Sequence, residues 1–477
     1  MSKLRKFTAS FRTRSFRVGG YSVVATAIIL AIILIANILV GALPTSVTEL
    51  DITPTNLFSI SEQTKDILNH LDQDVTLYWI CQSGVEDTTL ETLLERYSTG
   101  SSRVKLERID PDLNPTFAQG YPEEEINNNG VVVVSENRYR YVDPQDIYLE
   151  EMDYETYQYV YDFDGENAIT SAIDYVVRED LPQISALTGH GEMELSKAYS
   201  RAVSLENFTI SNLSLLARDA IPDTTDILLI CAPTTDISQD EAAIIAQYLA
   251  QGGELVLISI PTLIETYPNL YGVLSAYGVS AIDGIILDPD AQHNYYGTTH
   301  YLFPDMLEHS ITQPLLDNGI RIMLPEAHGL KIEEALPEGV SVTSLLRTSS
   351  AAYAKTDLAS TQYADGDATG VFSVAAVITH AINQEESANI LWVSCPQLMD
   401  ASVNDAVSGG NLNFFMNGLN WMCDHEESIS IRPKNQDTTY LTINSGTATL
   451  MSILVVGIIP LCYLGIGIYI FIRRKRK

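Results

Sequence analysis

Two long apolar runs without a charged side chain lie near the ends of the chain. They extend over residues 21–43 and 448–472. A helix needs about 20 apolar residues to cross a hydrocarbon layer of about 30 Å, so each run predicts a transmembrane helix. Pro460 and the glycines of the second run are compatible with this, because membrane helices tolerate both residue types.

A cleaved signal peptide is the alternative for the first run. The apolar part of a signal peptide is usually about 7–15 residues long and is followed by a small-x-small cleavage site. The run at 21–43 is longer, and no clear site of this kind follows it. We therefore expect a retained anchor.

Basic residues flank both runs on their outer sides. Residues 1–20 carry six Lys or Arg and no acidic residue, and 473–477 are all basic. Because Lys and Arg resist translocation, both tails are expected in the cytoplasm and residues 44–447 outside. The pattern predicts a protein of the cell membrane with two spans and an extracytoplasmic body.

Residues 44–145 have the pattern of a small α/β domain. Strands are expected at 75–80, 104–110, 131–135 and 139–142, with a helix at 90–97 between the first two. A βαβ unit followed by a hairpin is the outline of a thioredoxin-like domain. At the place of a thioredoxin CxxC motif the chain has Cys81-Gln82-Ser83-Gly84, so dithiol chemistry is excluded.

Residues 146–425 show strands alternating with helices. After a Tyr- and Glu-rich stretch at 146–161, interpreted as a surface connector, a helix at 168–177 leads into the alternation. Strands are expected at 184–187, 226–230, 254–260 and 284–288, and two more within 371–395. Helices are expected after 192, at 270–277 and at 411–423, and another begins with a capping box of Ser238 and Glu241 and stops at Gly252-Gly253. Continuous apolar strands of this kind predict a parallel sheet covered on both faces. Residues 426–447 are expected to form a polar stalk.

The body between the two runs is strongly acidic. Of 28 basic residues, 11 lie in the tails, which leaves 17 against 61 acidic residues and a net charge of −44. Such a body is a poor binder of nucleic acid or anionic lipid. The five cysteines show neither CxxC nor metal-ligand spacing, so no disulfide framework is expected.

Several segments resemble the GldG-like family of auxiliary proteins of ABC-type transport systems, named for gliding-motility components. They are LFSISEQTKDIL, IDPDLNP and GENAITSAIDYV in the first part, and PQISALTGHGEMEL, IPDTTDILLICAPTTDISQDEAAIIAQYLAQGGELVLISIP and LYGVLSAYGVSAIDGIILD further on. The resemblance covers about residues 45–425. It implies a membrane-anchored protein beside an ABC permease and ATPase, with a Rossmannoid sheet similar to class-I glutamine amidotransferases. The chain contains no GxxxxGK[ST], so the ATPase must be a partner.

The turn Gly189-His190-Gly191-Glu192 is the most suggestive motif. It follows a strand and precedes a helix, where open α/β sheets bind ligands and where amidotransferase-like folds place a nucleophile. His190 stands at this position, but neither Cys nor Ser lies between the glycines. A structural turn, ligand or partner binding, and catalysis remain the three interpretations, and acyl transfer lacks its nucleophile.

Two other chemistries have weaker support. The residues from which a metal site could be built are Asp283, Asp288, Asp290, His293, His300 and His309, but their separations match no compact zinc spacing. The sequence contains no G-x-S-x-G motif, which would have indicated a hydrolase. The basic C-terminus is interpreted as a topology anchor that meets lipid headgroups, not as a nucleic-acid site.

Together these features predict a non-enzymatic auxiliary subunit of an ABC-type export or envelope-remodelling system, without a metal or other cofactor. Its partners would be the permease and ATPase subunits and membrane lipid, with no nucleic acid. The alternatives are a cell-surface hydrolase with a degenerate amidotransferase-like domain, and a binding or scaffold protein.

Overall fold

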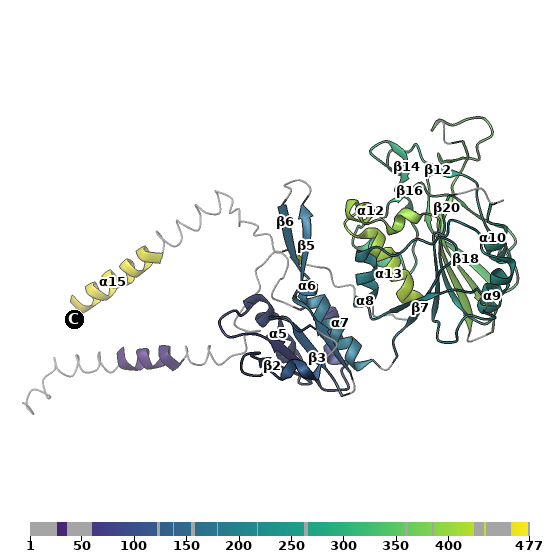
Figure 1. Cartoon of the computed structure of the whole chain (residues 1–477). Helices are drawn as coiled ribbons and strands as arrows, with labels where there is room; N and C mark the ends of the chain where they lie inside the picture. The colour runs from purple at the N-terminus through teal and green to yellow at the C-terminus, as the bar shows by residue number, and fades with distance from the viewer. Residues whose placement is uncertain are drawn as a thin grey trace, which may run out of the picture.

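A computed structural model gives the fold of most of the chain (Figure 1). It describes residues 26–35, 60–121, 125–136, 138–153, 158–178, 180–216, 218–261, 266–357, 361–383, 386–423, 434–435 and 459–475. Two α/β units follow one another along the chain, and each is built around its own sheet.

The first unit contains a four-stranded sheet in the order β2-β1-β3-β4. Its strands and the helix that joins the first two are β1 (Val75–Ile80), α5 (Thr88–Gly100), β2 (Val104–Ile109), β3 (Val131–Val134) and β4 (Tyr139–Val142). β1 and β2 are parallel, whereas β3 is antiparallel to both β1 and β4. The predicted βαβ unit with a following hairpin is confirmed.

The core of this unit extends beyond residue 145, where the sequence placed the domain boundary. Helix α4 (Glu62–Asn69), α5, the short α6 (Pro144–Ile147) and α7 (Gly165–Val177) pack on one face of the sheet. Ile169 and Ile173 of α7 are fully buried in this core. α7 therefore belongs to the first sheet, because its apolar side chains are buried there and not under the second sheet.

The Tyr- and Glu-rich stretch after residue 146 is a hairpin, not a connector. β5 (Tyr148–Asp153) pairs antiparallel with β6 (Gln158–Phe163), and β22 (Lys434–Asn435) pairs with β6 on its other side. The prediction was wrong because a hairpin is held by backbone pairing, which a polar sequence supplies as well as an apolar one.

The second unit is built on a ten-stranded sheet with the main order β11-β17-β20-β21-β10-β9-β7-β8, and β18 and β15 attached beside β20. Five neighbouring strands are parallel: β7 (Gln183–Leu187), β8 (Thr209–Leu213), β9 (Ile227–Cys231), β10 (Glu254–Ile258) and β21 (Ser387–Val393). The predicted parallel sheet is confirmed.

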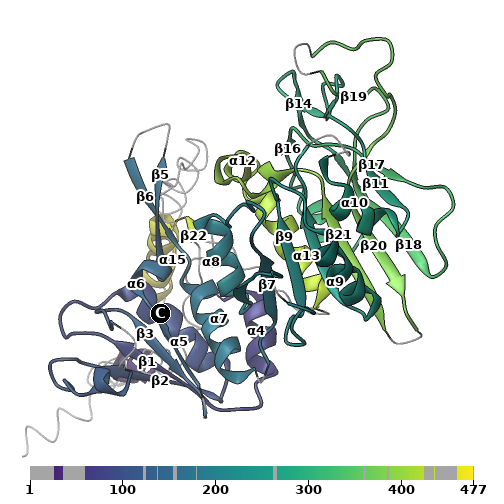
Figure 2. The same ribbon diagram turned by 45° about the vertical axis from the view of Figure 1, so that its right-hand side comes forward.

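Helices cover both faces of this sheet (Figure 2). On one face lie α8 (Lys197–Leu205) and α13 (Gly410–Met422), with Tyr199 and Phe414 fully buried. On the other lie α9 (Gln239–Ala250) and α10 (Pro268–Ser275), with Ile245 and Leu274 fully buried. This arrangement of one sheet between two helical layers agrees with the expectation from the alternating pattern.

Beyond β10 the chain departs from simple alternation. β20 (Ser373–Ala381) joins β21 in the main sheet, as predicted. β12 (Ile285–Leu287) does not, because it pairs with β19 (Tyr353–Lys355) in a separate two-stranded sheet. The remaining elements of the second unit are β11 (Val279–Ala281), β13 (Asn294–Tyr295), β14 (Thr298–Leu302), β15 (Asp305–Met306), α11 (Gln313–Asp317), β16 (Leu324–Pro325), β17 (Leu330–Ile332), β18 (Val340–Arg347) and α12 (Ala401–Ala406). The 3-10 turns are η1 (Phe117–Gly120) in the first unit and η3 (Pro396–Met399) in the second.

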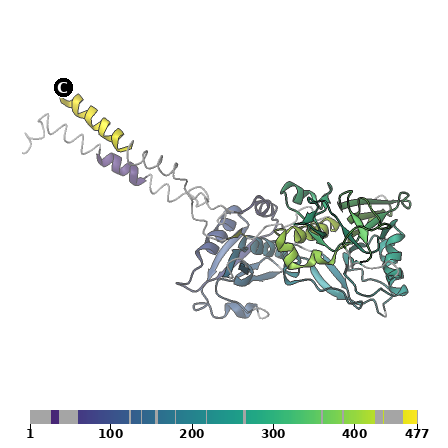
Figure 3. The ribbon, with the colours of Figure 1, turned by 90° about the horizontal axis from the view of Figure 1, so that it is seen from above.

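Two apolar helices lie on the same side of the α/β body (Figure 3). Residues 26–35 form one, with seven Ile or Leu side chains 54–61% exposed, and α15 (Ile459–Lys475) is the other. Among the described residues, no helix is both long and apolar enough to cross a membrane. The remainder of the predicted spans 21–43 and 448–472, the tail 1–20 and most of the expected stalk lie outside the described residues.

Candidate functional site

The connections between strands reverse direction between β7 and β9. From β7 the chain passes through α8 to β8 at the edge of the sheet, then returns past β7 to β9, and from β9 it continues through α9 to β10 on the other side. Open α/β sheets bind ligands outside the carboxyl ends of the strands at such a reversal. The turn at 188–192 follows β7, and residues 232–235 follow β9 at this same place.

The two glycines give the turn its shape. Gly189 has φ +126° and Gly191 has φ +74°, both in the region that favours glycine. A Cβ on Gly191 would stand 2.1 Å from Thr234 Oγ1, whereas one on Gly189 would meet nothing within 4 Å. The backbone amides of Thr234 and Thr235 donate to the His190 carbonyl over 2.9 and 3.0 Å. The segments after β7 and β9 are therefore tied together.

The His190 ring lies between two carboxylates. Nδ1 is 2.9 Å from Glu192 Oε1, and Nε2 is 3.1 Å from Glu241 Oε2. The three side chains are only 8–11% exposed. Because both ring nitrogens are engaged, the imidazole has no free lone pair with which to accept a proton from a substrate.

The carboxylates also hold the backbone. Glu192 Oε2 accepts from the amides of Gly189 and His190 over 3.0 and 2.8 Å. Glu241 forms the capping box of α9 with Ser238, as the sequence predicted. His190 therefore joins the turn after β7 to the first turn of α9.

Burial and charge act in opposite directions on these groups. Burial alone would lower the pKa of His190, but hydrogen bonds and charge interactions with Glu192 and Glu241 raise it above its ordinary value. Burial alone would raise the pKa of Glu241, but the hydrogen bonds from Ser238 and His190 lower it. These surroundings therefore favour the protonated form of His190 and the ionised form of Glu241.

The turn does not open directly into a helix, contrary to the prediction. α8 begins only at Lys197, and the intervening chain is bound to β9 through the Met193 amide, which donates to the Cys231 carbonyl over 2.8 Å. A nucleophile elbow requires the strand to turn straight into a helix. His190 is therefore not placed as an elbow residue.

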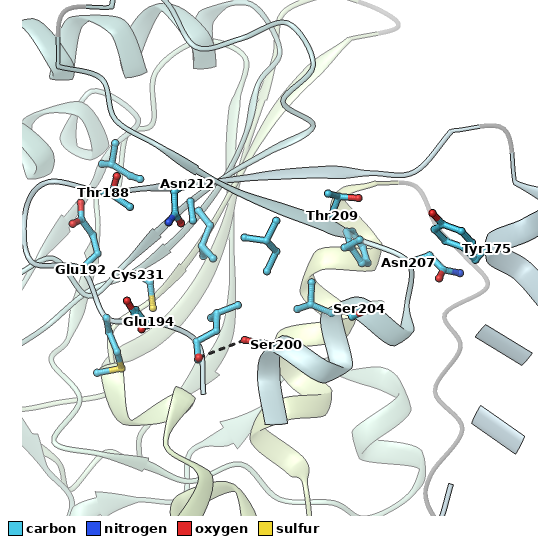
Figure 4. Close-up of a pocket in the computed structure, with 18 of the residues that line it drawn as sticks. Tyr175, Thr188, Glu192, Glu194, Ser200, Ser204, Asn207, Thr209, Asn212 and Cys231 are labelled. Carbon is cyan, nitrogen blue, oxygen red and sulfur yellow. Dashed lines mark hydrogen bonds between the residues drawn. The ribbon is translucent and has the colours of Figure 1, made fainter. Parts of the chain in front are cut away.

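A cavity of about 910 Å³ opens beside this turn (Figure 4). Thr188, Gly189, Gly191 and Glu192 line it, while His190 is not part of the lining. Three of the four predicted site residues thus line the cavity. The fourth, His190, instead contacts Glu192 and Glu241 and so stabilises the turn. Ala186, Leu229 and Cys231 provide an apolar part of the lining on the α8 face of the sheet.

Cys231 lines the cavity but is not poised for nucleophilic attack. The residue is 4% exposed, and burial raises the pKa of its thiol to about 12. Burial likewise raises the pKa of Cys81 and that of Cys395, the latter to about 12. These three cysteines and Cys423 are free thiols.

The first unit contributes to one end of the cavity. Arg140 Nη1 donates to Asn207 Oδ1 over 2.5 Å, and Arg140 Nη2 donates to the Ser204 carbonyl over 3.1 Å. Arg201 of α8 pairs with Asp164 at the start of α7 over 2.8 Å. No local pattern in the sequence signals these contacts, because the partners are far apart along the chain.

The residues considered for a metal site are not brought together. Asp288 accepts hydrogen bonds from the Ser349 amide and hydroxyl, while His293 lies 3.6 Å from Asp290 and 3.1 Å from Asp305. Within the described part of the chain, no three His, Cys, Asp or Glu residues are arranged to hold a metal ion.

The core of the second unit contains a polar cluster that sequence reasoning missed. The Ser259 hydroxyl lies 2.7 Å from His328 Nε2 and accepts from Trp392 Nε1 over 2.7 Å, while His328 Nδ1 lies 3.0 Å from the Gly329 carbonyl. Ser259 and His328 are 2% and 1% exposed. Burial lowers the pKa of His328 to about 4. A Ser–His pair at this depth is out of reach of a substrate and stabilises the core.

Fold and site together define a mixed α/β protein with a parallel-sheet unit and a cavity at the place where the strand connections reverse, between β7 and β9. Residues 181–383 match the family of an ABC-type uncharacterized transport system, and residues 54–158 match a domain of unknown function (DUF7088). The first match supports the auxiliary-transport family that the sequence motifs indicated. The narrower GldG assignment is not confirmed by it. No curated protein matches the chain.

Solved structures share only a distant likeness. The N-terminal domain of mmIFT52 is 11% identical with a TM-score of 0.37, over 50% of this chain and 97% of that one. PurLQS from Thermotoga maritima is 13% identical with a TM-score of 0.26, over 51% of this chain and 100% of that one. The cytoplasmic protein STM1381 from Salmonella typhimurium LT2 is 14% identical with a TM-score of 0.26, over 48% and 98%.

Proposed function

We propose that this protein is a non-enzymatic, membrane-anchored auxiliary subunit of an ABC-type export or envelope-remodelling system. Its α/β body docks on the permease or on cargo, and its apolar ends pack in the membrane beside the permease. The observation that carries the proposal is the match of residues 181–383 to an ABC-type transport-system family. These residues contain the turn, most of the cavity lining and most of the large sheet.

The distribution of charge and apolar surface supports an anchored body. The Ile and Leu side chains of the helix at residues 26–35 are more than half exposed, a state that suits lipid and not water. The basic tails lie outside the apolar runs and the −44 body lies between them. This arrangement supports cytoplasmic termini and an extracytoplasmic body.

A binding role is also supported by the chemistry around the cavity. Both nitrogens of His190 are held by carboxylates, and burial keeps the Cys231 thiol protonated at neutral pH because it raises the pKa to about 12. Neither residue has the free base or thiolate that nucleophilic catalysis requires. The same turn instead provides a rigid rim of hydrogen-bonded backbone.

The finer family relationships belong to this proposal. The strand order β2-β1-β3-β4, with helix α7 packed on the sheet, supports a thioredoxin-like first domain that lacks the redox dithiol. The doubly covered parallel sheet supports a Rossmannoid, amidotransferase-like second domain that has lost its nucleophile. The motifs quoted from the sequence support membership of the GldG-like family.

A mild-detergent pull-down tests the transport role. The full-length tagged chain is solubilised, captured and analysed by quantitative mass spectrometry, with an unrelated two-span protein carrying the same tag as control. We expect an ABC ATPase and a permease to be enriched over the control at comparable amounts. Recovery of neither protein, from cells in which both are detected, would refute the auxiliary role and favour the surface-hydrolase or scaffold alternative.

Labelling of an introduced cysteine tests the topology. Asp153→Cys at the end of β5, in a Cys423→Ser background, is treated with a membrane-impermeant thiol reagent in intact cells. Cys81, Cys231 and Cys395 are buried, so these three thiols should add little background signal. We expect labelling before lysis. Labelling only after lysis would place the body in the cytoplasm.

A further inference from the structure

The outer edge of β8 is open. β8 is the last strand of the large sheet and pairs with β7 alone among the described strands. The Thr209 amide donates to the Pro182 carbonyl, and the Leu213 carbonyl accepts from the Thr188 amide. In a parallel ladder every second residue bonds to a given neighbour. Thr209, Ser211 and Leu213 therefore face β7.

It follows that Ile210 and Asn212 direct their amides and carbonyls away from the sheet. Across the described ranges, neither residue has a backbone hydrogen bond to another strand on that side. Asn212 is exposed and Ile210 is half-buried. An edge with two free donors and two free acceptors is a template on which an extended chain can pair.

The cavity lies directly under this edge. Ile210 packs against the apolar core on the α8 face of the sheet, and both Ile210 and Asn212 line the cavity. Figure 4 shows Asn212 near Thr188 and Glu192, with Tyr175 of the first unit at the far end. A strand added beside β8 would direct every second side chain to the α8 face, and so into this space.

The cavity suits a long basic side chain. Its apolar part, formed by Ala186, Leu229 and Cys231, can cover an aliphatic stem. Glu194 lines the same cavity, is exposed, and has no ion pair within the described residues. The body around it carries a net charge of −44, which attracts basic segments and repels acidic ones.

We infer that β8 takes up an extended, Lys- or Arg-containing peptide segment of a partner protein as an added strand, with one basic side chain in the cavity near Glu194. Backbone pairing with Ile210 and Asn212 provides the affinity, and the cavity provides the preference for a basic side chain. This inference goes beyond the proposed function, because it holds whether or not the partner is part of a transporter.

The test uses the immobilised full-length chain in detergent and a pool of acetylated hexapeptides. The pool has Lys at alternate positions and a mixture of Val, Ile and Thr at the others, and bound peptide is quantified by mass spectrometry. We expect binding to fall about tenfold for a pool methylated at every second backbone nitrogen, which retains the side chains and removes the donors. A pool with Glu in place of Lys should bind more weakly still.

Matched variants locate the site. Asn212→Pro removes an outward amide that the sheet does not use, and proline is tolerated on such an edge. We expect Asn212→Pro and Glu194→Gln each to weaken binding about three- to tenfold, with Asn212→Ala, which keeps the amide, weakening it less than Asn212→Pro. Thermal unfolding checks that each variant is folded.

Three outcomes would overturn the inference. They are no binding of the Lys pool at millimolar peptide, equal binding of the methylated and unmethylated pools, and a concentration-dependent dimer of the chain itself that Asn212→Pro abolishes. The last would make a second copy the occupant of the edge. The methylated pool decides the question even where Asn212→Pro does not fold, and neither result depends on recovery of a permease or ATPase.

Discussion

The second unit holds two histidines in opposite surroundings. His190 lies in the turn after β7 between Glu192 and Glu241, and the carboxylates raise its pKa. His328 lies in the core beside Ser259 and Trp392, and burial lowers its pKa to about 4. The surroundings thus favour the protonated form of the imidazole in the turn after β7 and its neutral form in the core. What surrounds an imidazole, more than its place in a motif, decides its chemistry.

The largest expected effect comes from protonation of His328. A lowered pKa in the folded state means that the unfolded chain binds the proton first, so stability falls as pH decreases from about 6.5 to about 4, by roughly 3 kcal/mol. Denaturant unfolding of the wild type and His328→Gln across this range measures the difference. An equal acid dependence in both proteins would contradict the buried, neutral state of His328.

The next effect separates the two glycines of the turn. Gly191→Ala should destabilise the protein by about 2 kcal/mol, because strain at positive φ is joined by the contact with Thr234 Oγ1. Gly189→Ala should lose about 1 kcal/mol, since only strain applies there. Unfolding free energies measure both. Adding Thr234→Ala should restore part of the loss in the first variant and none in the second, and the opposite pattern would rule out the steric account.

A smaller effect tests the charge on His190. Because its folded pKa is raised, its stabilising contribution is fully present below about pH 6.5 and is lost as pH rises through the folded value. His190→Ala should therefore lose about 1 kcal/mol at pH 5.5 and less at pH 8.5. Thermal unfolding at the two pH values measures the difference. A greater loss at pH 8.5 would show that the neutral ring is the stabilising form.

The smallest effect concerns partner binding. If His190 acts only by holding the turn, His190→Ala should leave the recovery of permease and ATPase unchanged per folded molecule. The pull-down described above, normalised to the amount of folded chain, measures this. Loss of partners at normal abundance would instead make His190 a contact residue.

Local patterns in the sequence were sufficient for much of the fold. Apolar strands such as Val75–Ile80 and Ile227–Cys231 and the capping box of Ser238 and Glu241 were predicted where they occur. Each depends on residues close together in the chain, whose periodicity or spacing is visible in the sequence. The hairpin β5–β6 was missed because acidic residues interrupt the apolar pattern of β5, Tyr148–Asp153.

The candidate site divides in the same way. The residues in order along the chain indicate that Gly189 and Gly191 form a sharp turn after a strand, and that an acidic body lies between apolar, basic-flanked ends. Three features emerge only in the folded protein: Glu241 contacts His190 from the next helix, His328 pairs with Ser259, and β8 has an open edge above a cavity. These depend on which segments the sheet order brings together, and pairings between distant residues leave no periodic trace in a single sequence.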